Sequence, residues 1–120
     1  MTNLLSETIE AIGRSGHGIS RVVFIGSLDG NYRCDVDEFW VLADREYDAG
    51  SGSSEVAVNL IVLFSDGKKL WRREYGDGSE GWDFDQTSAV DYTLPGLPIT
   101  NLIGEFWPSL AELNTGTVTP

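Results

Sequence analysis

The sequence predicts an α+β domain: an antiparallel β-meander of three to five strands, with an N-terminal helix and a second helix packed on the sheet. Three observations support this prediction. Residues 56–65 are almost continuously apolar, and Asp66-Gly67 then marks a hairpin turn. Residues 81–86 alternate between apolar and polar side chains, which is typical of a strand with one solvent-facing side. Two earlier segments have the spacing of amphipathic helices.

The first helix is expected at residues 3–12, with Thr2 or Asn3 as its cap and Gly13 at its end. Its apolar face is formed by Leu4, Leu5, Thr8, Ile9 and Ile12. Residues 19–28 then form a strand with apolar side chains on both faces, which favours a central position in the sheet. Residues 31–34 form a short edge strand after a turn at Asp29-Gly30.

The second helix is expected at residues 35–46. Asp35 is its N-cap, and Glu38 completes a capping box three residues later. The inward face consists of Val36, Phe39, Trp40, Ala43 and Tyr47. Asp35, Asp37 and Glu38 resemble a metal site, but carboxylates are common in the first turn of a helix because they complement its dipole.

The hairpin at Asp66-Gly67 is predicted to have a two-residue loop, and this loop fixes the register of the two strands. The predicted pairs are Phe64 with Lys69, Val62 with Trp71, Leu60 with Arg73, and Val58 with Tyr75. Trp71 and Tyr75 are therefore expected to be buried. In the next strand Trp82 and Phe84 should point into the core, which turns Asp83 and Asp85 toward water.

The C-terminal part of the chain is expected to close the core. Leu102, Ile103, Phe106 and Trp107 form a lid, and residues 108–113 form a short helix that starts near a proline. Residues 1–113 are predicted to be a single domain, and residues 114–120 a flexible tail.

The net charge of -11 over 120 residues is the most unusual property of the composition. Such a charge argues against direct binding to nucleic acid or to an anionic membrane, and it suits a basic protein partner. Cys34 is the only cysteine, which fits a reducing compartment. The first residues lack the basic and the long apolar segments of a signal peptide, so none is expected, and no apolar run approaches roughly 20 residues. The expected location is the cytoplasm, of a host cell if the protein is encoded by a phage.

No set of residues indicates an enzyme, a metal or a cofactor. Residues 48–54 lack the lysine of a phosphate-binding loop, and residues 77–88 lack the ligands of a calcium loop. His17 is interpreted as a solvent-exposed loop residue without a nucleophile or carboxylate nearby. We therefore expect Cys34 and His17 to be dispensable for function.

The acidic residues are concentrated in the middle of the chain, where fifteen acidic and six basic residues lie between Asp29 and Asp91. The predicted partner-binding face consists of Asp77, Glu80, Asp83 and Asp85, supported by Asp44, Glu46, Asp48 and Glu55. The alternative is that this face is only solvated. A basic partner would relieve the repulsion among these carboxylates.

Three segments of this region, YDAGSGSSEVA, LIVLFSDGKKLWRREY and DGSEGWDF, resemble small acidic proteins of phages and prophages, which include anti-CRISPR proteins. The chain departs from their pattern by the extra Gly76 and by Gly81 in place of an aromatic residue. The resemblance implies inhibition by binding, with carboxylates that block a DNA-binding surface of a CRISPR effector. The alternative is a structural or assembly component of a phage or of another complex.

Overall fold

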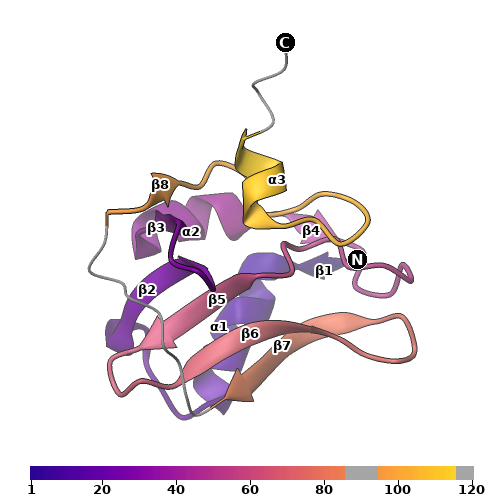
Figure 1. Ribbon diagram of the computed structural model, residues 1–120. Coiled ribbons are helices and arrows are strands. Elements are labelled where there is room, and N and C mark those ends of the chain that lie inside the picture. Colours follow the sequence, from indigo (N-terminus) through magenta and orange to yellow (C-terminus); the bar gives the residue numbers. More distant parts are fainter. Residues whose placement is uncertain (86–94, 116–120) are drawn as a thin grey trace.

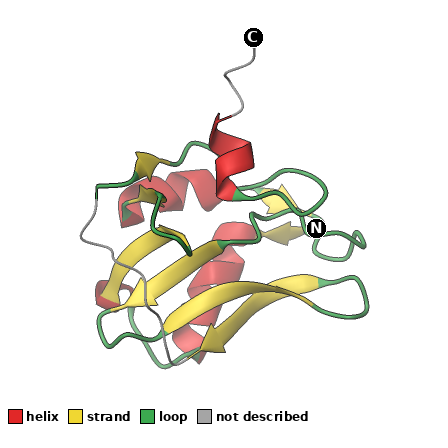
Figure 2. Cartoon of the chain, viewed as in Figure 1, coloured by secondary structure: helices red, strands yellow, loops and turns green. Residues whose placement is uncertain are grey.

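The computed structural model describes residues 1–85 and 95–115, and it confirms the predicted α+β class (Figure 1). The main sheet has six strands in the order β7-β6-β5-β2-β3-β8. These strands are β2 (Val22–Ser27), β3 (Tyr32–Cys34), β5 (Leu60–Phe64), β6 (Lys69–Glu74), β7 (Glu80–Asp85) and β8 (Leu97–Pro98). Figure 2 shows β2, β5, β6 and β7 side by side as one layer, with the N-terminal helix behind it.

The sheet is larger than predicted, and it is mixed rather than purely antiparallel. All neighbouring strands are antiparallel except β3 and β8, which run parallel. The Leu97 N–H donates to the carbonyl of Asn31 at 2.7 Å and holds β8 beside β3. A two-residue strand has no alternation for a sequence pattern to detect. β3, which was expected at the edge, is therefore an inner strand, while β2 is central as predicted.

Helices α1 (Leu4–Arg14) and α2 (Val36–Ala43) pack on the same face of the main sheet (Figure 1). The cap of α1 is Asn3, whose side chain accepts a hydrogen bond from the Ser6 N–H at 2.9 Å. The predicted capping box of α2 is confirmed, because Asp35 and Glu38 each accept a hydrogen bond from the other's backbone N–H. α2 ends earlier than predicted.

The early end of α2 makes room for a second, two-stranded sheet. β4 (Glu46–Tyr47) pairs antiparallel with β1 (Thr2–Asn3), at the start of the chain. Tyr47 was expected on the apolar face of the helix. It is buried as expected, but it reaches the core from β4.

The hydrophobic core fills the space between the two helices and the sheet. Its largest fully buried side chains include Leu4, Phe39, Tyr47, Leu60 and Phe64. Ile9 was expected on this side of α1 but is exposed, and Ala11 is buried instead. A smaller apolar cluster of Phe24, Ile61 and Leu63 lies apart from this core, with Val23 and Trp71 packed against it.

The register of the β5–β6 hairpin differs from the prediction by one residue. The Phe64 N–H donates to the Lys68 carbonyl at 2.8 Å, so the loop contains three residues, and Gly67 has a φ of 89°. Three-residue hairpin loops commonly consist of a turn followed by a glycine in the left-handed conformation. Asp66-Gly67 therefore suits this loop as well as the predicted two-residue loop. Val62 consequently pairs with Leu70 rather than with Trp71.

A shift of one residue turns every side chain of a strand to the opposite face. Leu70 and Arg72 therefore point into the main core, while Trp71 packs on the other face of the sheet. The predicted burial of Tyr75 against Val58 is wrong, because these two side chains are 38% and 40% exposed. β5 itself begins only at Leu60, and Ala57 instead donates its N–H to the Leu102 carbonyl at 2.9 Å.

The predicted C-terminal lid is only half correct. Leu102 and Ile103 are buried, and Ile103 bridges to Val56, but Phe106 and Trp107 are exposed. α3 (Leu110–Thr115) starts two residues later than expected.

The ordered domain extends past residue 113. The Asn114 side chain accepts hydrogen bonds from the backbone of Thr100 and Asn101 at 2.7 and 3.0 Å. Residues 116–120, the rest of the predicted tail, lie outside the described residues. None of the helices in the described part of the chain has the length and apolar character needed to cross a membrane.

Candidate functional site

Three loops lie against one another at the end of the molecule where the β6–β7 hairpin turns (Figure 1). The loop after β4 meets the hairpin turn through a bond from the Gly52 N–H to the Gly78 carbonyl at 3.1 Å. The loop before α3 joins them, because Trp107 donates its N–H to the Ser54 carbonyl at 2.9 Å. Segments that are far apart in the sequence therefore form one surface.

The contact between the first two loops depends on glycine. Gly78 has a φ of 88°, and a Cβ atom built there would lie 3.2 Å from the Cα of Gly52. Both the left-handed conformation and the close approach of two backbones favour glycine at this position. Gly52, which has a φ of 94°, and Gly78 thus have a structural reason to be glycine.

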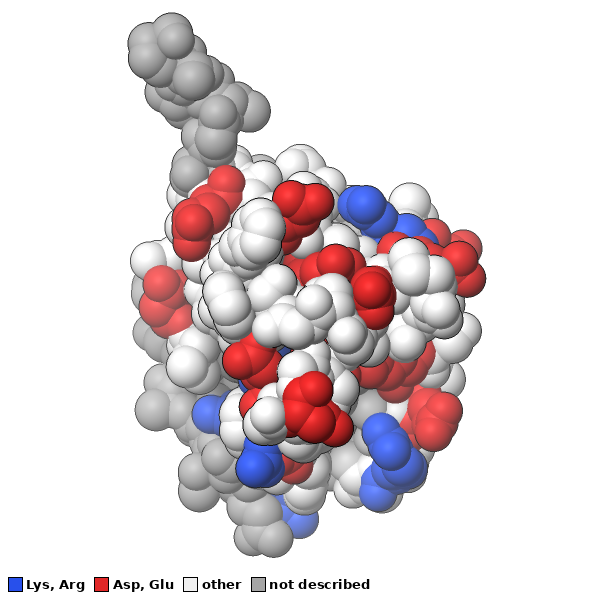
Figure 3. Space-filling view, turned by 90° about the vertical axis from the view of Figure 1, so that its right-hand side faces the viewer, with Lys and Arg blue, Asp and Glu red and all other residues white. Residues whose placement is uncertain are grey.

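Carboxylates dominate this surface. The segments 46–55, 74–79 and 104–107, here called the loop face, contain no Lys, Arg or His. Their acidic residues are Glu46, Asp48, Glu55, Glu74, Asp77 and Glu105. Glu55 is half-buried and the other five are exposed. Figure 3 views the molecule from this side and shows acidic side chains across it, with few basic ones among them.

Four of the predicted partner-binding residues are exposed as expected. Asp44 lies beside the loop face and accepts a hydrogen bond from the Asn3 side chain at 3.1 Å, while Glu46 and Asp48 precede and begin the first loop. Asp77 lies in the hairpin turn, where hydrogen bonds from the hydroxyl and the N–H of Ser79 lower its pKa. Asp77 is therefore negatively charged at neutral pH.

Glu80 was expected on the exposed acidic face, and this expectation is wrong. Its side chain is buried and bonds to the Arg72 guanidinium at 2.9 Å. Its two carboxylate oxygens also accept the backbone N–H groups of Glu55 and Val56 at 2.7 and 3.3 Å. Glu80 therefore fastens the first loop to β7 rather than facing a partner.

Asp83 is only partly available for a partner. Its carboxylate bonds to the Arg73 guanidinium at 2.7 Å, and this bond, with another from the Phe84 N–H, lowers the pKa of Asp83. Asp85 pairs in register with Lys69 at the far end of β7, and its side chain lies outside the described part of the structure. The predicted ridge of Asp83 and Asp85 is thus separate from the loop face.

A buried charge network supports the loop face from beneath. Arg72 bonds to Glu7 of α1 at 3.0 Å as well as to Glu80, and it also donates to the Tyr47 hydroxyl at 2.9 Å. The Tyr47 hydroxyl in turn donates to Glu7 at 2.7 Å, and burial raises the pKa of Tyr47. The guanidinium also lies 5.0 Å from the centre of the Trp82 ring. This network joins α1, β4, β6 and β7.

His17 is neither exposed nor without partners, contrary to the prediction. Its ring stacks on Phe64 at 3.9 Å, and only 7% of its side chain is accessible. Nδ1 lies 2.9 Å from the Ser15 hydroxyl, and Nε2 lies 2.8 Å from the Asp66 carboxylate. The hydrogen bond from His17 also lowers the pKa of Asp66.

This Ser-His-Asp row resembles a catalytic arrangement, but its surroundings favour a structural role. The Ser15 hydroxyl also lies 2.7 Å from the Ile12 carbonyl, where it caps the end of α1. The N–H groups of Ser15, Gly16 and His17 all bond to helix carbonyls. These three donors are therefore not free to stabilise an oxyanion. The row links the end of α1 to the β5–β6 turn.

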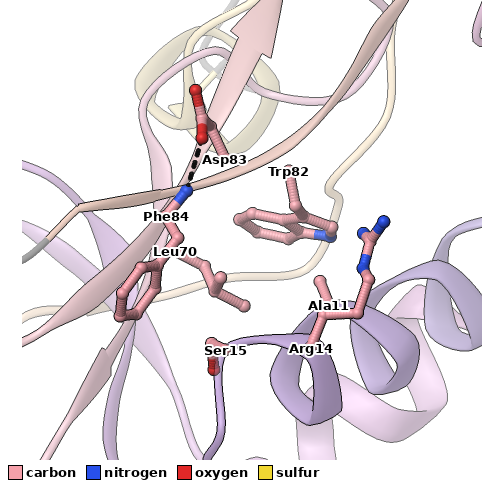
Figure 4. Close-up of a pocket in the computed structure, with 7 residues that line it drawn as sticks. All are labelled: Ala11, Arg14, Ser15, Leu70, Trp82, Asp83 and Phe84. Atoms are coloured by element: carbon pink, nitrogen blue, oxygen red, sulfur yellow. Dashed lines mark hydrogen bonds between the residues drawn. The ribbon is translucent and has the colours of Figure 1, made fainter.

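A cavity of about 300 Å³ lies beside this row, between the last turns of α1 and strands β6 and β7 (Figure 4). It is lined by Ala11, Arg14, Ser15, Leu70, Trp82, Asp83 and Phe84. Figure 4 shows the Arg14 side chain next to the Trp82 ring, and the Asp83 carboxylate bonded to the Phe84 N–H. Four of the seven lining residues are apolar, and the charged ones are Arg14 and Asp83.

The described residues contain no group of three or more His, Cys, Asp or Glu side chains placed to hold a metal ion. Asp35 and Glu38, which resemble a metal site in the sequence, form the α2 capping box instead. Cys34 is buried, and burial together with the nearby carboxylates of Glu38 and Asp35 raises the pKa of its thiol to about 12. This thiol is therefore protonated and inert at neutral pH.

No family model, curated protein or solved structure matches this chain. The resemblance of the central segments to phage proteins thus stays a prediction, and the geometry of the loop face is the main guide to function. Sequence reasoning missed Glu74 and Glu105 as members of this face, and it placed Phe106 and Trp107 in the core lid. No local signal could have found them, because long-range loop contacts bring them together.

Proposed function

We propose that this protein is an inhibitor that acts by binding a basic protein surface through its loop face. The observation that carries the proposal is the gathering of six carboxylates, without one basic residue, from three segments distant in sequence. Repulsion among these charges costs some stability, and a basic partner relieves it. Hydrogen bonds and glycines fix the loops, which reduces the entropy lost on binding.

The nearby positive charges of Arg72 and Arg73 are paired with other carboxylates and do not neutralise the loop face. Arg72 is buried and is shared between Glu7 and Glu80, which are not among the six carboxylates. Arg73 is paired with Asp83 on the neighbouring strand. The loop face therefore keeps its negative field, which would steer a positively charged partner toward it.

The specific partner that we propose is a CRISPR effector, on the basis of the resemblance to anti-CRISPR proteins. Effectors hold nucleic acid in positively charged channels, and an array of fixed carboxylates competes for such a surface. On this proposal the protein itself contacts neither nucleic acid nor a membrane, because both are anionic.

A DNA-competition experiment tests this proposal. Two guide-RNA-loaded effectors, one of the single-chain Cas9 type and one of the multi-subunit type, are incubated with the protein before a labelled target duplex is added. We expect at least one effector to lose binding to the duplex at a stoichiometric amount of the protein. A duplex mixed with the protein alone should be unaffected. Unchanged DNA binding by both effectors would contradict the proposal and favour a structural or assembly role.

A further inference from the structure

Two aromatic side chains protrude from the loop face in an unfavourable backbone conformation. Phe106 and Trp107 have φ values of 61° and 55°, and they are 72% and 49% exposed. They are the non-glycine residues with positive φ in the described part of the chain. For a bulky residue this backbone conformation is strained, and it persists only where the surrounding structure imposes it.

The surrounding structure does impose it. The Gly104 N–H donates to the Glu55 carbonyl at 2.7 Å, and the Trp107 N–H donates to Ser54. The Pro108 carbonyl accepts the Val58 N–H at 2.8 Å, and the Trp107 indole N–H bonds to the Glu74 carboxylate. The loop is therefore held on both sides of Phe106, and its two aromatic residues are displayed in a fixed arrangement.

Neither the turn nor the core explains why aromatic residues occupy these positions. Glycine adopts a positive φ without strain, so glycine is the residue that the turn itself favours at position 106. Phe106 is mostly exposed to water, so it contributes little to the hydrophobic core. Water-exposed aromatic side chains on a fixed loop are instead typical of the anchors of protein interfaces.

We propose that Phe106 is the anchor with which the loop face inserts into an apolar socket on its protein partner, with Trp107 packed beside it. The inference rests on the proposed function and adds to it the shape of the partner: an apolar socket surrounded by Arg or Lys. The carboxylates around Phe106, including Glu105 next to it, form a negatively charged rim. This rim is complementary to the Arg or Lys residues around the socket of the partner.

Charge complementarity selects this occupant over the alternatives. A second copy of the chain in a two-fold contact would place the six carboxylates of one loop face against those of the other. Nucleic acid and anionic lipid would meet the same repulsion. A basic protein surface with an apolar socket is complementary to both the acidic rim and the aromatic centre.

Anchor and rim have different kinetic effects. Rim charges mainly change the association rate and its dependence on salt, whereas a buried anchor mainly changes the dissociation rate. Substitution of Phe106 should therefore accelerate dissociation at low and at high salt alike. The loss of an anchor corresponds to an affinity decrease on the order of 30-fold or more.

Phe106→Gly separates this role from a structural one, because it removes the aromatic ring and relieves the strained φ. The variant and the wild-type protein are compared by thermal unfolding and by binding kinetics on the two guide-RNA-loaded effectors. We expect the melting temperature of Phe106→Gly to equal or exceed that of the wild type, and its dissociation to be much faster. Val41→Ala, a change at an exposed apolar residue of α2, is the matched control and should alter neither.

The outcomes distinguish this inference from the proposed function. If the wild type binds an effector and Phe106→Gly dissociates from it at the same rate, Phe106 is not an anchor, while the proposed inhibitor function still stands. If Phe106→Gly lowers the melting temperature by several degrees, Phe106 is a structural residue and the anchor is again wrong. If the wild type binds neither effector, the proposed function fails, and the anchor that depends on it fails as well.

Discussion

Arg72 and Glu80 lie on adjacent strands with Nη2 and Oε1 2.9 Å apart, and both side chains are buried. Glu80 also accepts hydrogen bonds from the backbone N–H groups of Glu55 and Val56, at the end of the loop that follows β4. This ion pair therefore connects the β6–β7 hairpin to that loop. It fixes the base on which the exposed carboxylates are arranged.

Removal of Arg72 should destabilise the whole fold. In Arg72→Met the carboxylates of Glu7 and Glu80 remain, but they lose their common positive partner. Breaking a buried ion pair in this way costs about 3–5 kcal/mol. Urea unfolding of the variant measures this loss.

Arg73→Met is the control, because Arg73 is the next residue and its side chain is 50% exposed in its pair with Asp83. Exposed ion pairs contribute about 1 kcal/mol or less. Equal unfolding free energies for the two variants would show that Arg72 is not buried between two carboxylates. The β5–β6 hairpin would then have the register of a two-residue loop, as predicted from the sequence.

Cys34 should be unreactive in the folded protein. It is 5% exposed, and its pKa is raised from 9.0 to about 12. A thiol reagent added at pH 8 should label the native protein slowly and the urea-unfolded protein completely. Rapid labelling of the native protein, measured by absorbance or mass, would contradict the burial of this side chain.

The same shift predicts how stability changes at high pH. Because the folded state holds the thiol proton more tightly than the unfolded state, the contribution of Cys34 is fully present below pH 9.0. It is lost as the pH rises from 9.0 toward 12. The variant Cys34→Ala should lack this component of the decrease, which urea unfolding at pH 8 and at pH 10 measures.

The sequence predicts the helices well because their signals are local. Asn3, Asp35 and Glu38 define helix starts through their own hydrogen bonds. The hairpin register is different: Asp66-Gly67 suits both a two-residue and a three-residue loop, and only packing of the completed core distinguishes them. Trp71 was therefore expected on the core face of β6, which Leu70 and Arg72 occupy instead.

The candidate site shows the same division. The exposure of Glu46, Asp48 and Asp77 follows from polar, Gly-rich loops and could be predicted. The burial of Glu80 depends on Arg72, which the incorrect register had placed on a different face. Phe106 looked like a core residue because composition alone does not reveal that its loop is held at the surface.

On the proposed function, the loop face binds a basic partner through its carboxylates. The most direct test is the association rate with a guide-RNA-loaded effector at about 50 and 300 mM salt, conditions that differ strongly in screening. Three proteins are compared: the wild type, the double variant Glu46→Lys/Glu105→Lys, and the control Glu10→Lys/Asp37→Lys. The control changes the net charge equally, on exposed residues of α1 and α2 outside the three loops.

We expect wild-type association to slow as salt rises, and the loop-face variant to associate more slowly than the control at low salt, on the order of tenfold. The difference between the two variants should shrink at high salt because the charges are screened. Equal association rates for the loop-face variant and the control, or a wild-type rate that does not depend on salt, would contradict the claim.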